Sequence, residues 1–198
     1  MSTMPIAIDA IEMPWTLPSR GRVGMFSLIA AESAIFTIFV VAYIFYIGKS
    51  LSGPTPQQVL QLPIFNSICL LSSSLTIHLA VSALRRQKSG AFNLFWFLTL
   101  ALGTIFLVGT GREWYHLIYQ EGLTISTNLF GTTYYSLVGL HAFHVTAGLV
   151  GLSVVMILAL AGAVKQEHTQ RVDVLSLYWH FVDVVWVVVF TVVYIVGK

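Results

Sequence analysis

The sequence predicts an all-α fold: a polytopic membrane bundle of five transmembrane helices. Three observations support this prediction. Hydrophobic residues make up 57% of the 198 residues and charged residues only 9%, whereas a soluble domain carries about 25% charged residues. The mean hydropathy is +0.83, and five stretches are apolar over the roughly 20 residues that a helix needs to cross a bilayer. These values exclude a soluble globule, a disordered chain and a coiled coil.

The elements follow one another along a single expected domain, residues 23–198. Before it lies an arm, residues 1–22, which prolines and acidic residues interrupt in a way that is not typical of a signal peptide. The five spans are expected at about 24–47, 64–84, 92–111, 133–162 and 174–196. The sequence shows no internal repeat linking its two halves, so it lacks the usual signature of a transporter.

Lysine and arginine predict the orientation of the bundle, because cytoplasmic loops are enriched in these residues. With five spans, the two ends of the chain lie on opposite sides of the membrane. One side receives seven basic residues: Arg20, Arg22, Arg85, Arg86, Lys88, Lys165 and Arg171. The other side receives three, Lys49, Arg112 and Lys198. We therefore expect the N-terminus inside, with residues 1–22 as a cytoplasmic arm, and the C-terminus outside.

The charge balance and the cysteine content exclude further classes of function. A net charge of +2 is too small and too scattered to indicate a nucleic-acid partner. The single cysteine, Cys69, excludes an internal disulfide and any zinc or iron–sulfur site built from cysteines. It lies in an apolar run, where we interpret it as a small buried residue.

Ionisable residues inside the spans are the candidates for function, because an unpaired charge within a bilayer is costly. Only two formal charges, Glu32 and Asp183, fall inside the spans. Three histidines accompany them: His141 and His144 in the fourth span and His180 in the fifth. His141 and His144 share one helix face, as do His180 and Asp183. We expect these five side chains to form a buried polar cluster between the first, fourth and fifth spans.

Three interpretations of this cluster remain open. Imidazole and carboxylate groups suit a metal such as iron or zinc, which would make the chain an independent intramembrane metalloenzyme or carrier. Carboxylate-bridged metal bundles carry a Glu-x-x-His motif on two helices, however, and neither His141 with His144 nor His180 with Asp183 supplies it, so we assign no metal ligand. A carboxyl group within the membrane, such as Glu32, also suits proton transfer. The third interpretation is that the groups hydrogen-bond one another and hold the helices together.

The connector before the fifth span carries Lys165, His168 and Arg171 on the predicted cytoplasmic side. Basic side chains next to a span can bind phospholipid head groups, although the positive-inside rule alone also accounts for them. Trp179 is interpreted as an aromatic residue near the membrane interface. These four residues are the candidates for lipid binding.

The fifth span contains a string, Tyr178–Trp186 (YWHFVDVVW), that closely resembles the last helix of subunit III of the haem–copper terminal oxidases, or cytochrome c oxidase subunit 3. Four other segments resemble parts of that family in the same order: FSLIAAE (26–32), PIFN (63–66), GREWY (111–115) and GLHAFHV (139–145). The resemblance covers about residues 20–197. The long form of the family has two further helices at the start, so this chain is similar to the short, five-helix bacterial form.

The resemblance implies a subunit without redox centres or catalytic residues, in the bacterial cytoplasmic (inner) membrane. Haem and copper would belong to partner subunits I and II. The chain would pack beside catalytic subunit I and support its integrity, phospholipid binding and proton uptake. A small subunit IV and a larger respiratory supercomplex are further partners that the resemblance allows. The complex would couple aerobic electron transport to proton pumping as a cytochrome c oxidase, with a ubiquinol oxidase as the alternative.

The resemblance also assigns roles to residues. Glu32 would be the buried carboxyl group of the family, close to His141 and His144. Trp179, His180 and Asp183 would be the signature of the last helix. Lys165, His168 and Arg171 would correspond to a lipid-binding loop, which matches poorly in length and register.

Overall fold

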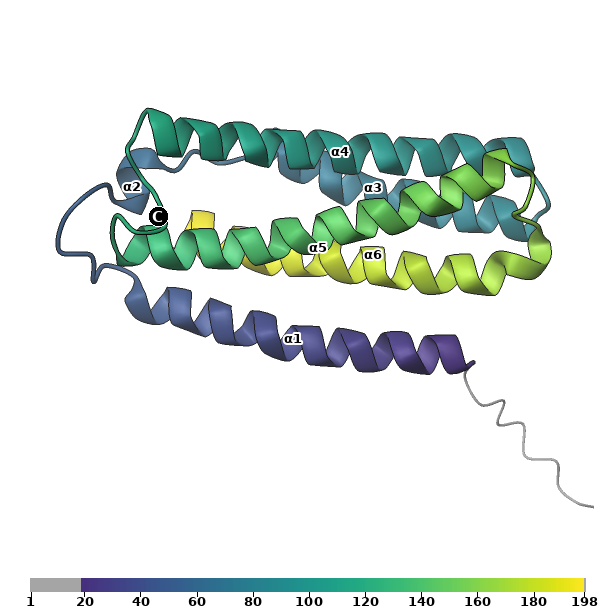
Figure 1. The fold of residues 1–198 in the computed structure, drawn as a ribbon, viewed down its shortest axis with the longest axis horizontal. Coiled ribbons are helices and arrows are strands. Elements are labelled where there is room, and N and C mark those ends of the chain that lie inside the picture. Colours follow the sequence, from purple (N-terminus) through teal and green to yellow (C-terminus); the bar gives the residue numbers. More distant parts are fainter. Residues whose placement is uncertain (1–18, 198) are drawn as a thin grey trace, which may run out of the picture.

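The computed structural model describes residues 19–197 as a bundle of five long helices (Figure 1). These are α1 (Arg20–Tyr46), α3 (Ile64–Arg85), α4 (Ser89–Tyr119), α5 (Leu129–Leu160) and α6 (Thr169–Phe190). The helix α2 (Pro56–Val59) is a single turn, the 3-10 turn η1 (Gln166–His168) precedes α6, and the π-helix η2 (Thr191–Val196) continues it. Residues 19–197 contain no strand. All five long helices are long and apolar enough to cross a membrane, which confirms the predicted fold class.

Four of the five long helices extend more than one residue beyond the predicted spans at one end or both, because polar residues continue them. The helix α4 continues to Tyr119 rather than ending near residue 111. The helix α5 begins at Leu129 rather than near residue 133, because the side chain of Asn128 caps it by accepting a hydrogen bond of 2.8 Å from the Gly131 N–H. Hydropathy finds the part of a helix that lies in lipid, and capping residues decide where the helix ends.

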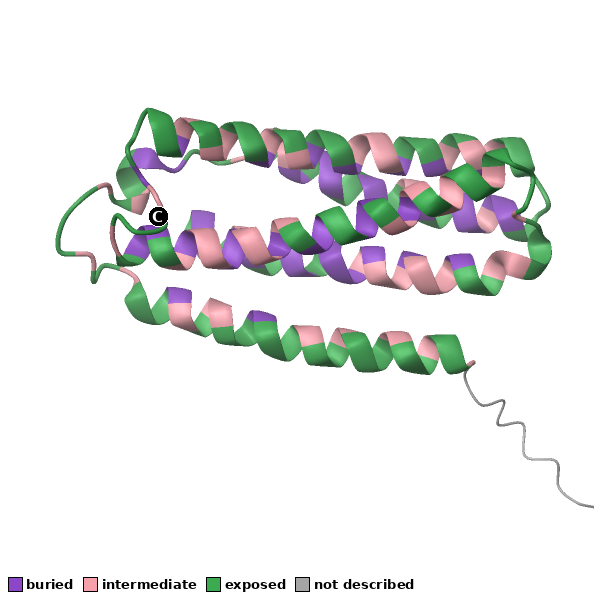
Figure 2. Cartoon of the chain, in the orientation of Figure 1, coloured by how far each residue is buried: buried purple, intermediate pink, exposed green. Residues whose placement is uncertain are grey.

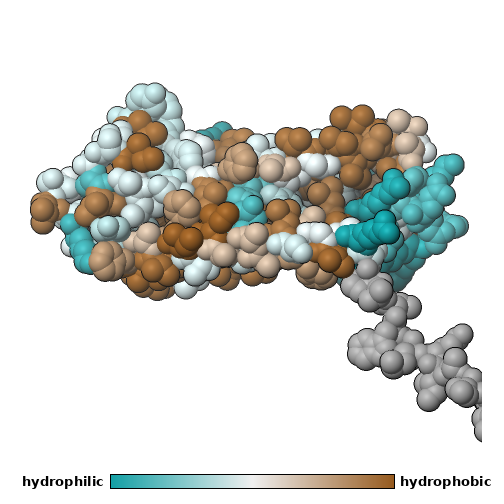
Figure 3. Space-filling model, turned by 60° about the horizontal axis from the view of Figure 1, so that its bottom comes forward, coloured by the Kyte–Doolittle hydropathy of each residue, from teal (hydrophilic) through white to brown (hydrophobic). Residues whose placement is uncertain are grey.

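The bundle has one basic end. Consecutive long helices run antiparallel, so their ends alternate between the two ends of the bundle (Figure 1). One end carries Arg20, Arg22, Arg85, Arg86, Lys88, Lys165 and Arg171, and we call it the basic end. Figure 3 shows a hydrophilic patch at this end, beside a broad hydrophobic surface. The seven residues that the topology groups together therefore share one end of the bundle.

The helices differ in how deeply they are packed. The helix α1 lies at the edge of the bundle, against α5 and α6, and most of its residues are exposed (Figure 2). The helices α3 and α6 carry a much larger share of buried residues. Large apolar side chains of α1, such as Phe26 and Ile38, face outward, where lipid or a partner subunit can cover them.

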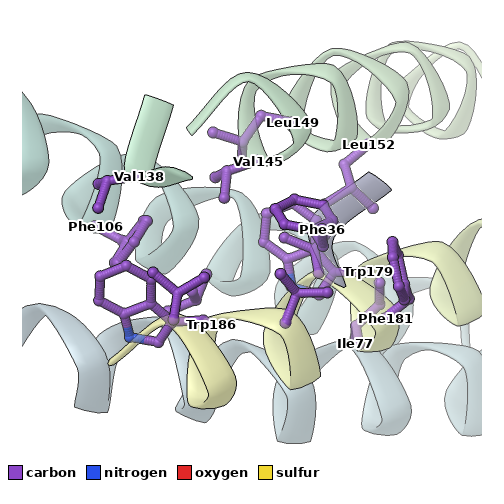
Figure 4. Close-up of a cluster of buried hydrophobic side chains, with 14 of the residues drawn as sticks. Phe36, Ile77, Phe106, Val138, Val145, Leu149, Leu152, Trp179, Phe181 and Trp186 are labelled. Atoms are coloured by element: carbon purple, nitrogen blue, oxygen red, sulfur yellow. The ribbon is translucent and has the colours of Figure 1, made fainter. Parts of the chain in front are cut away.

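Tryptophan side chains fill the core. Trp179 and Trp186 of α6 lie among Phe36, Phe106 and Leu149 (Figure 4), and both indoles are almost fully buried. Their N–H groups donate to hydroxyl groups of α3: Trp179 to Ser73 over 2.8 Å, and Trp186 to Ser67 over 3.0 Å. Each indole thus combines a large apolar area with a satisfied polar tip.

The position of Trp179 corrects one expectation. This residue cannot contact lipid as the candidates for lipid binding require, because its side chain is 0% exposed. Two glycines make room for the indole: a Cβ added at Gly103 or at Gly148 would come within 2.8 Å of the Trp179 ring. The indole therefore lies between α4 and α5, where glycine lets the helices approach closely.

Candidate functional site

A carboxyl–imidazole pair connects α1 to α5. Glu32 Oε2 lies 3.1 Å from His144 Nε2, and the two side chains are 22% and 7% exposed. The other ring nitrogen, His144 Nδ1, lies 2.8 Å from the carbonyl oxygen of Leu140. The Tyr178 hydroxyl donates to the backbone oxygen of His144 over 3.1 Å. The pair is therefore held by three helices, α1, α5 and α6.

The hydrogen bonds of this pair fix its proton count. The Leu140 carbonyl can only accept a hydrogen bond, so His144 Nδ1 must carry a proton. The contact between His144 Nε2 and Glu32 Oε2 needs a second proton, on either atom. The pair is then a carboxylic acid with a neutral imidazole, or a carboxylate with an imidazolium. Both forms have a net charge of zero, and they differ only in where one proton lies.

His141 lies one turn before His144 on α5 but has different surroundings. Its ring is fully buried, and neither nitrogen has a hydrogen-bond partner within residues 19–197. The ring stacks on Trp186, with centroids 5.0 Å apart, and meets the edge of Phe106 at 5.8 Å. Phe36 completes the enclosure. His141 thus packs as an aromatic ring in the core.

A second polar contact joins α6 to α3. The Ser74 hydroxyl donates to Asp183 Oδ2 and lies 2.9 Å from His180 Nδ1. A hydroxyl has one proton to donate, so His180 Nδ1 donates to Ser74 and Ser74 donates to Asp183. Asp183 is 3% exposed, and its Oδ1 has no partner in the part of the chain that the structure describes.

The structure therefore divides the single cluster that the sequence predicts. Glu32 and His144 meet between α1 and α5, whereas His180 and Asp183 meet Ser74 of α3. Residues two positions apart point to opposite sides of a helix. On α6, Phe181 faces α1, with its ring centroid 6.4 Å from that of Phe36, and Asp183 faces α3 instead.

Sequence reasoning missed two participants. Ser74 is one, although the run Ser72–Ser74 inside an apolar span is a signal that could have found it. Glu113 is the other: it lies beyond the predicted third span, but α4 continues through it. Glu113 Oε1 accepts hydrogen bonds from the hydroxyls of Tyr194 (2.8 Å) and Tyr134 (3.2 Å). This carboxyl group therefore anchors α4 to α5 and η2.

The predicted lipid-binding loop does not converge on one site. Lys165 lines a cavity of about 550 Å³ at the basic end together with the acidic Glu167. His168 and Arg171 are not among the residues that line it. The His168 ring instead accepts a hydrogen bond of 3.1 Å from the Lys165 backbone N–H. The three basic side chains share one end of the bundle without forming a common pocket.

The three histidines of the predicted polar cluster do not fit a haem or metal site. Both ring nitrogens of His144 are engaged, and His141 is enclosed by aromatic rings. His180 Nδ1 is bonded to Ser74. Within residues 19–197, no group of three or more His, Cys, Asp or Glu side chains could hold a metal ion. We therefore derive no step through a metal or haem in this chain.

Comparison with known proteins finds relatives over nearly the whole chain. A family model described as "Cytochrome c oxidase subunit III" matches residues 19–198. Cytochrome c oxidase subunit 3 of Synechocystis sp. is 40% identical over 182 residues, covering 90% of this chain and 76% of the relative. The protein of the same name from Alkalihalophilus pseudofirmus is 34% identical over 185 residues, 92% of this chain and 90% of the relative. Cytochrome bo(3) ubiquinol oxidase subunit 3 of Pseudomonas aeruginosa is 31% identical over 176 residues, which cover 88% of this chain and 84% of the relative.

Proposed function

Because this chain belongs to the cytochrome c oxidase subunit III family, we propose that it has a supporting, non-catalytic role in a haem–copper oxidase. Membership makes it a multi-pass protein of the bacterial inner membrane and a subunit of an oxidase complex with catalytic subunits. In our proposal, haem and copper lie in subunits I and II. This chain packs beside subunit I, preserves its integrity and supports its proton uptake.

The observation that carries this proposal is the Glu32–His144 pair. It lies about 18 Å along α1 from the basic end, at 1.5 Å per residue, and Glu32 remains 22% exposed. The pair holds one proton that both Glu32 Oε2 and His144 Nε2 can carry. Such a pair can retain a proton without placing an unpaired charge in the membrane, and it stays neutral while passing that proton on only if another proton replaces it. We propose that it also fixes α1 to the bundle.

We propose cytochrome c as the electron donor of the complex. The two relatives with the higher reported identities are named cytochrome c oxidase subunit 3. The alternative is a quinol, because relatives from Pseudomonas aeruginosa and Staphylococcus saprophyticus are named as subunits of quinol oxidases. Oxygen consumption by the purified complex with reduced cytochrome c or with ubiquinol as donor decides between them. A copper-binding motif in the subunit II gene beside this one would independently support cytochrome c.

Two substitutions at Glu32 in the complete complex test the role of the pair. Glu32→Gln keeps an N–H that can donate to His144 Nε2, but its amide cannot ionise and so cannot release or take up a proton. Glu32→Ala removes both the contact and the proton. If the pair handles protons, both variants shorten the time over which turnover is sustained and slow proton uptake, while the haem spectra stay unchanged.

The remaining outcomes separate the parts of the proposal. Normal turnover in Glu32→Gln with impaired assembly in Glu32→Ala would show a purely structural pair. Loss of the haem spectra in an assembled complex would contradict the division of labour between the subunits. The control is Ser33→Ala, which removes only an exposed hydroxyl bonded within α1. Complex from which this chain has been removed should keep its full haem and copper content, and haem or copper recovered with the isolated chain would place a redox centre here.

A further inference from the structure

Arg112 carries a charge that no ion pair among the described residues uses, at the end of the bundle opposite the basic end. Its side chain is exposed on α4, and it forms no ion pair within residues 19–197. Its neighbour Glu113 does not neutralise it, because that carboxyl group accepts hydrogen bonds from Tyr134 and Tyr194 in the core. A guanidinium without a protein partner at the edge of a membrane domain is a candidate ligand for phosphate.

Two adjoining cavities meet at Asn66 and Arg112: one lies between α4 and the connector that leads from α2 into α3, and the other lies between α3 and α4. The first, of about 290 Å³, is lined by polar groups of Gln61, Asn66, Arg112, Glu113 and His116 beside apolar side chains. The second, of about 490 Å³, is lined mainly by Phe65, Ile105, Val108 and Gly109, and it shares Asn66 and Arg112 with the first. We call the two together the α3–α4 groove. It has a polar end and an apolar end.

The shape of the groove follows from Gly109. A Cβ at this position would lie 2.2 Å from Asn66 Nδ2, so the Asn66 side chain lies directly on the backbone of α4. This contact forms the floor where the two cavities join. Beyond it, Phe65, Ile105 and Val108 are 70%, 42% and 51% exposed. The apolar part of the groove therefore opens to the bilayer rather than to the core.

The depth of Arg112 matches a lipid phosphate. It lies about 35 Å along α4 from Ser89 at the basic end, at 1.5 Å per residue. The hydrocarbon core of a bilayer is about 30 Å thick, so the guanidinium lies at the level of the head groups. An apolar groove below a cation at this level fits one class of ligand, a phospholipid.

We propose that the α3–α4 groove binds a phospholipid with a net negative charge, whose phosphate is held by the Arg112 guanidinium. One acyl chain lies along Phe65, Ile105 and Val108. Glu113 also lines the polar cavity but is held by its two tyrosine partners, so the Arg112 guanidinium determines the preference for an anion. This site lies at the end opposite Lys165, His168 and Arg171, and it does not depend on the role proposed for Glu32.

Photochemical labelling of the complete oxidase complex tests this site. The complex is reconstituted in vesicles that contain phosphatidylglycerol with a photoactivatable group in one acyl chain, and labelled peptides are mapped after illumination. We expect labelling of α3 and α4 around Phe65, Ile105 and Val108. Arg112→Gln should lower this labelling about fivefold, as expected for one basic residue near a lipid surface. Arg112→Lys should retain most of it.

The matched control is Lys49→Gln, which removes a basic residue at the same end of the bundle and should leave the labelling unchanged. The same probe built on phosphatidylcholine should label the groove less strongly. Equal labelling in Arg112→Gln and in the unsubstituted complex would overturn the proposal. The proposal would also be overturned if the probe did not label the groove and crosslinks showed that a partner subunit occupies it.

Discussion

The helices α1 and α6 lie side by side in the same bundle, yet different forces hold them. Nine of the 22 residues of α6 are buried, including two tryptophans with satisfied N–H groups. Only two of the 27 residues of α1, Phe36 and Tyr43, are buried. Lipid is as apolar as leucine, so burial alone gives little attraction between helices in a membrane. The helix α6 is held by close packing, and α1 depends on a few polar contacts.

Those polar contacts lie at two levels of α1. At the basic end, Asp173 of α6 accepts from Arg22 of α1 over 2.6 Å and from Arg85 of α3 over 2.9 Å. Deeper in the bundle, Glu32 meets His144. The helix α1 is therefore more easily separated from the bundle than α6. The following predictions test this difference between α1 and α6, from the largest expected effect to the smallest.

The largest effect is expected where α6 is most closely packed. Gly148→Leu would force a side chain into the ring of Trp179, from which even a Cβ would be 2.8 Å away. We expect a loss of stability at the upper end of the roughly 1–3 kcal/mol typical of overpacked cores, measured as a lower midpoint of thermal unfolding of the complex. Gly24→Leu on α1 is the control, because a Cβ there meets nothing within 4 Å. Equal effects of the two substitutions would contradict the comparison.

A smaller effect is expected from Ser74→Ala. This change removes the hydroxyl that donates to Asp183 and accepts from His180, and it leaves a buried carboxyl group without any described partner. The loss of stability should be about 2 kcal/mol, within the usual cost of an unsatisfied buried group. Ser72→Ala, two positions earlier on the exposed side of α3, should change the unfolding midpoint little. If both variants melt alike, the α3–α6 contact does not hold α6 in place.

The smallest effect is expected at the basic end. Asp173→Asn weakens both ion pairs, whose arginines are 41% and 57% exposed, so the cost should be about 0.5–1 kcal/mol. Hydrogen exchange should then become faster in the first turns of α1 and stay unchanged in α6. Glu167→Gln, an exposed substitution in the neighbouring turn, serves as the control. Faster exchange throughout the bundle would show that α1 and α6 open together.

The sequence was sufficient to predict the five spans and to select both residues of the Glu32–His144 pair as candidates. An apolar run of membrane length has few other stable structures, because lipid requires every backbone group to be bonded within the helix. Glu32 and His144 were found because ionisable residues stand out in such runs. Glu32 contacts His144 and not Asp183 because of which helices are neighbours in space. Hydropathy carries no information about that arrangement.

Ser74 and Glu113 were missed for the same reason: the sequence does not show which helices are neighbours. Ser74 looks unremarkable among small residues of an apolar span until α6 brings Asp183 and His180 to it. Glu113 lies beyond the predicted end of the third span near residue 111, but α4 continues through it and two tyrosine hydroxyls donate to its carboxyl group. Polar partners on other helices determine whether such residues are buried and hydrogen-bonded.

The neutral form of the Glu32–His144 pair has a consequence for an energised membrane. One elementary charge that crosses the whole bilayer experiences about 2.3 kcal/mol per 100 mV of membrane potential. A proton that moves within this pair travels no more than the 3.1 Å between Oε2 and Nε2, roughly a tenth of the hydrocarbon thickness. The potential can therefore bias this movement by only about 0.2 kcal/mol per 100 mV. The proton can therefore move between Glu32 and His144 almost equally well in a resting membrane and in a fully energised one.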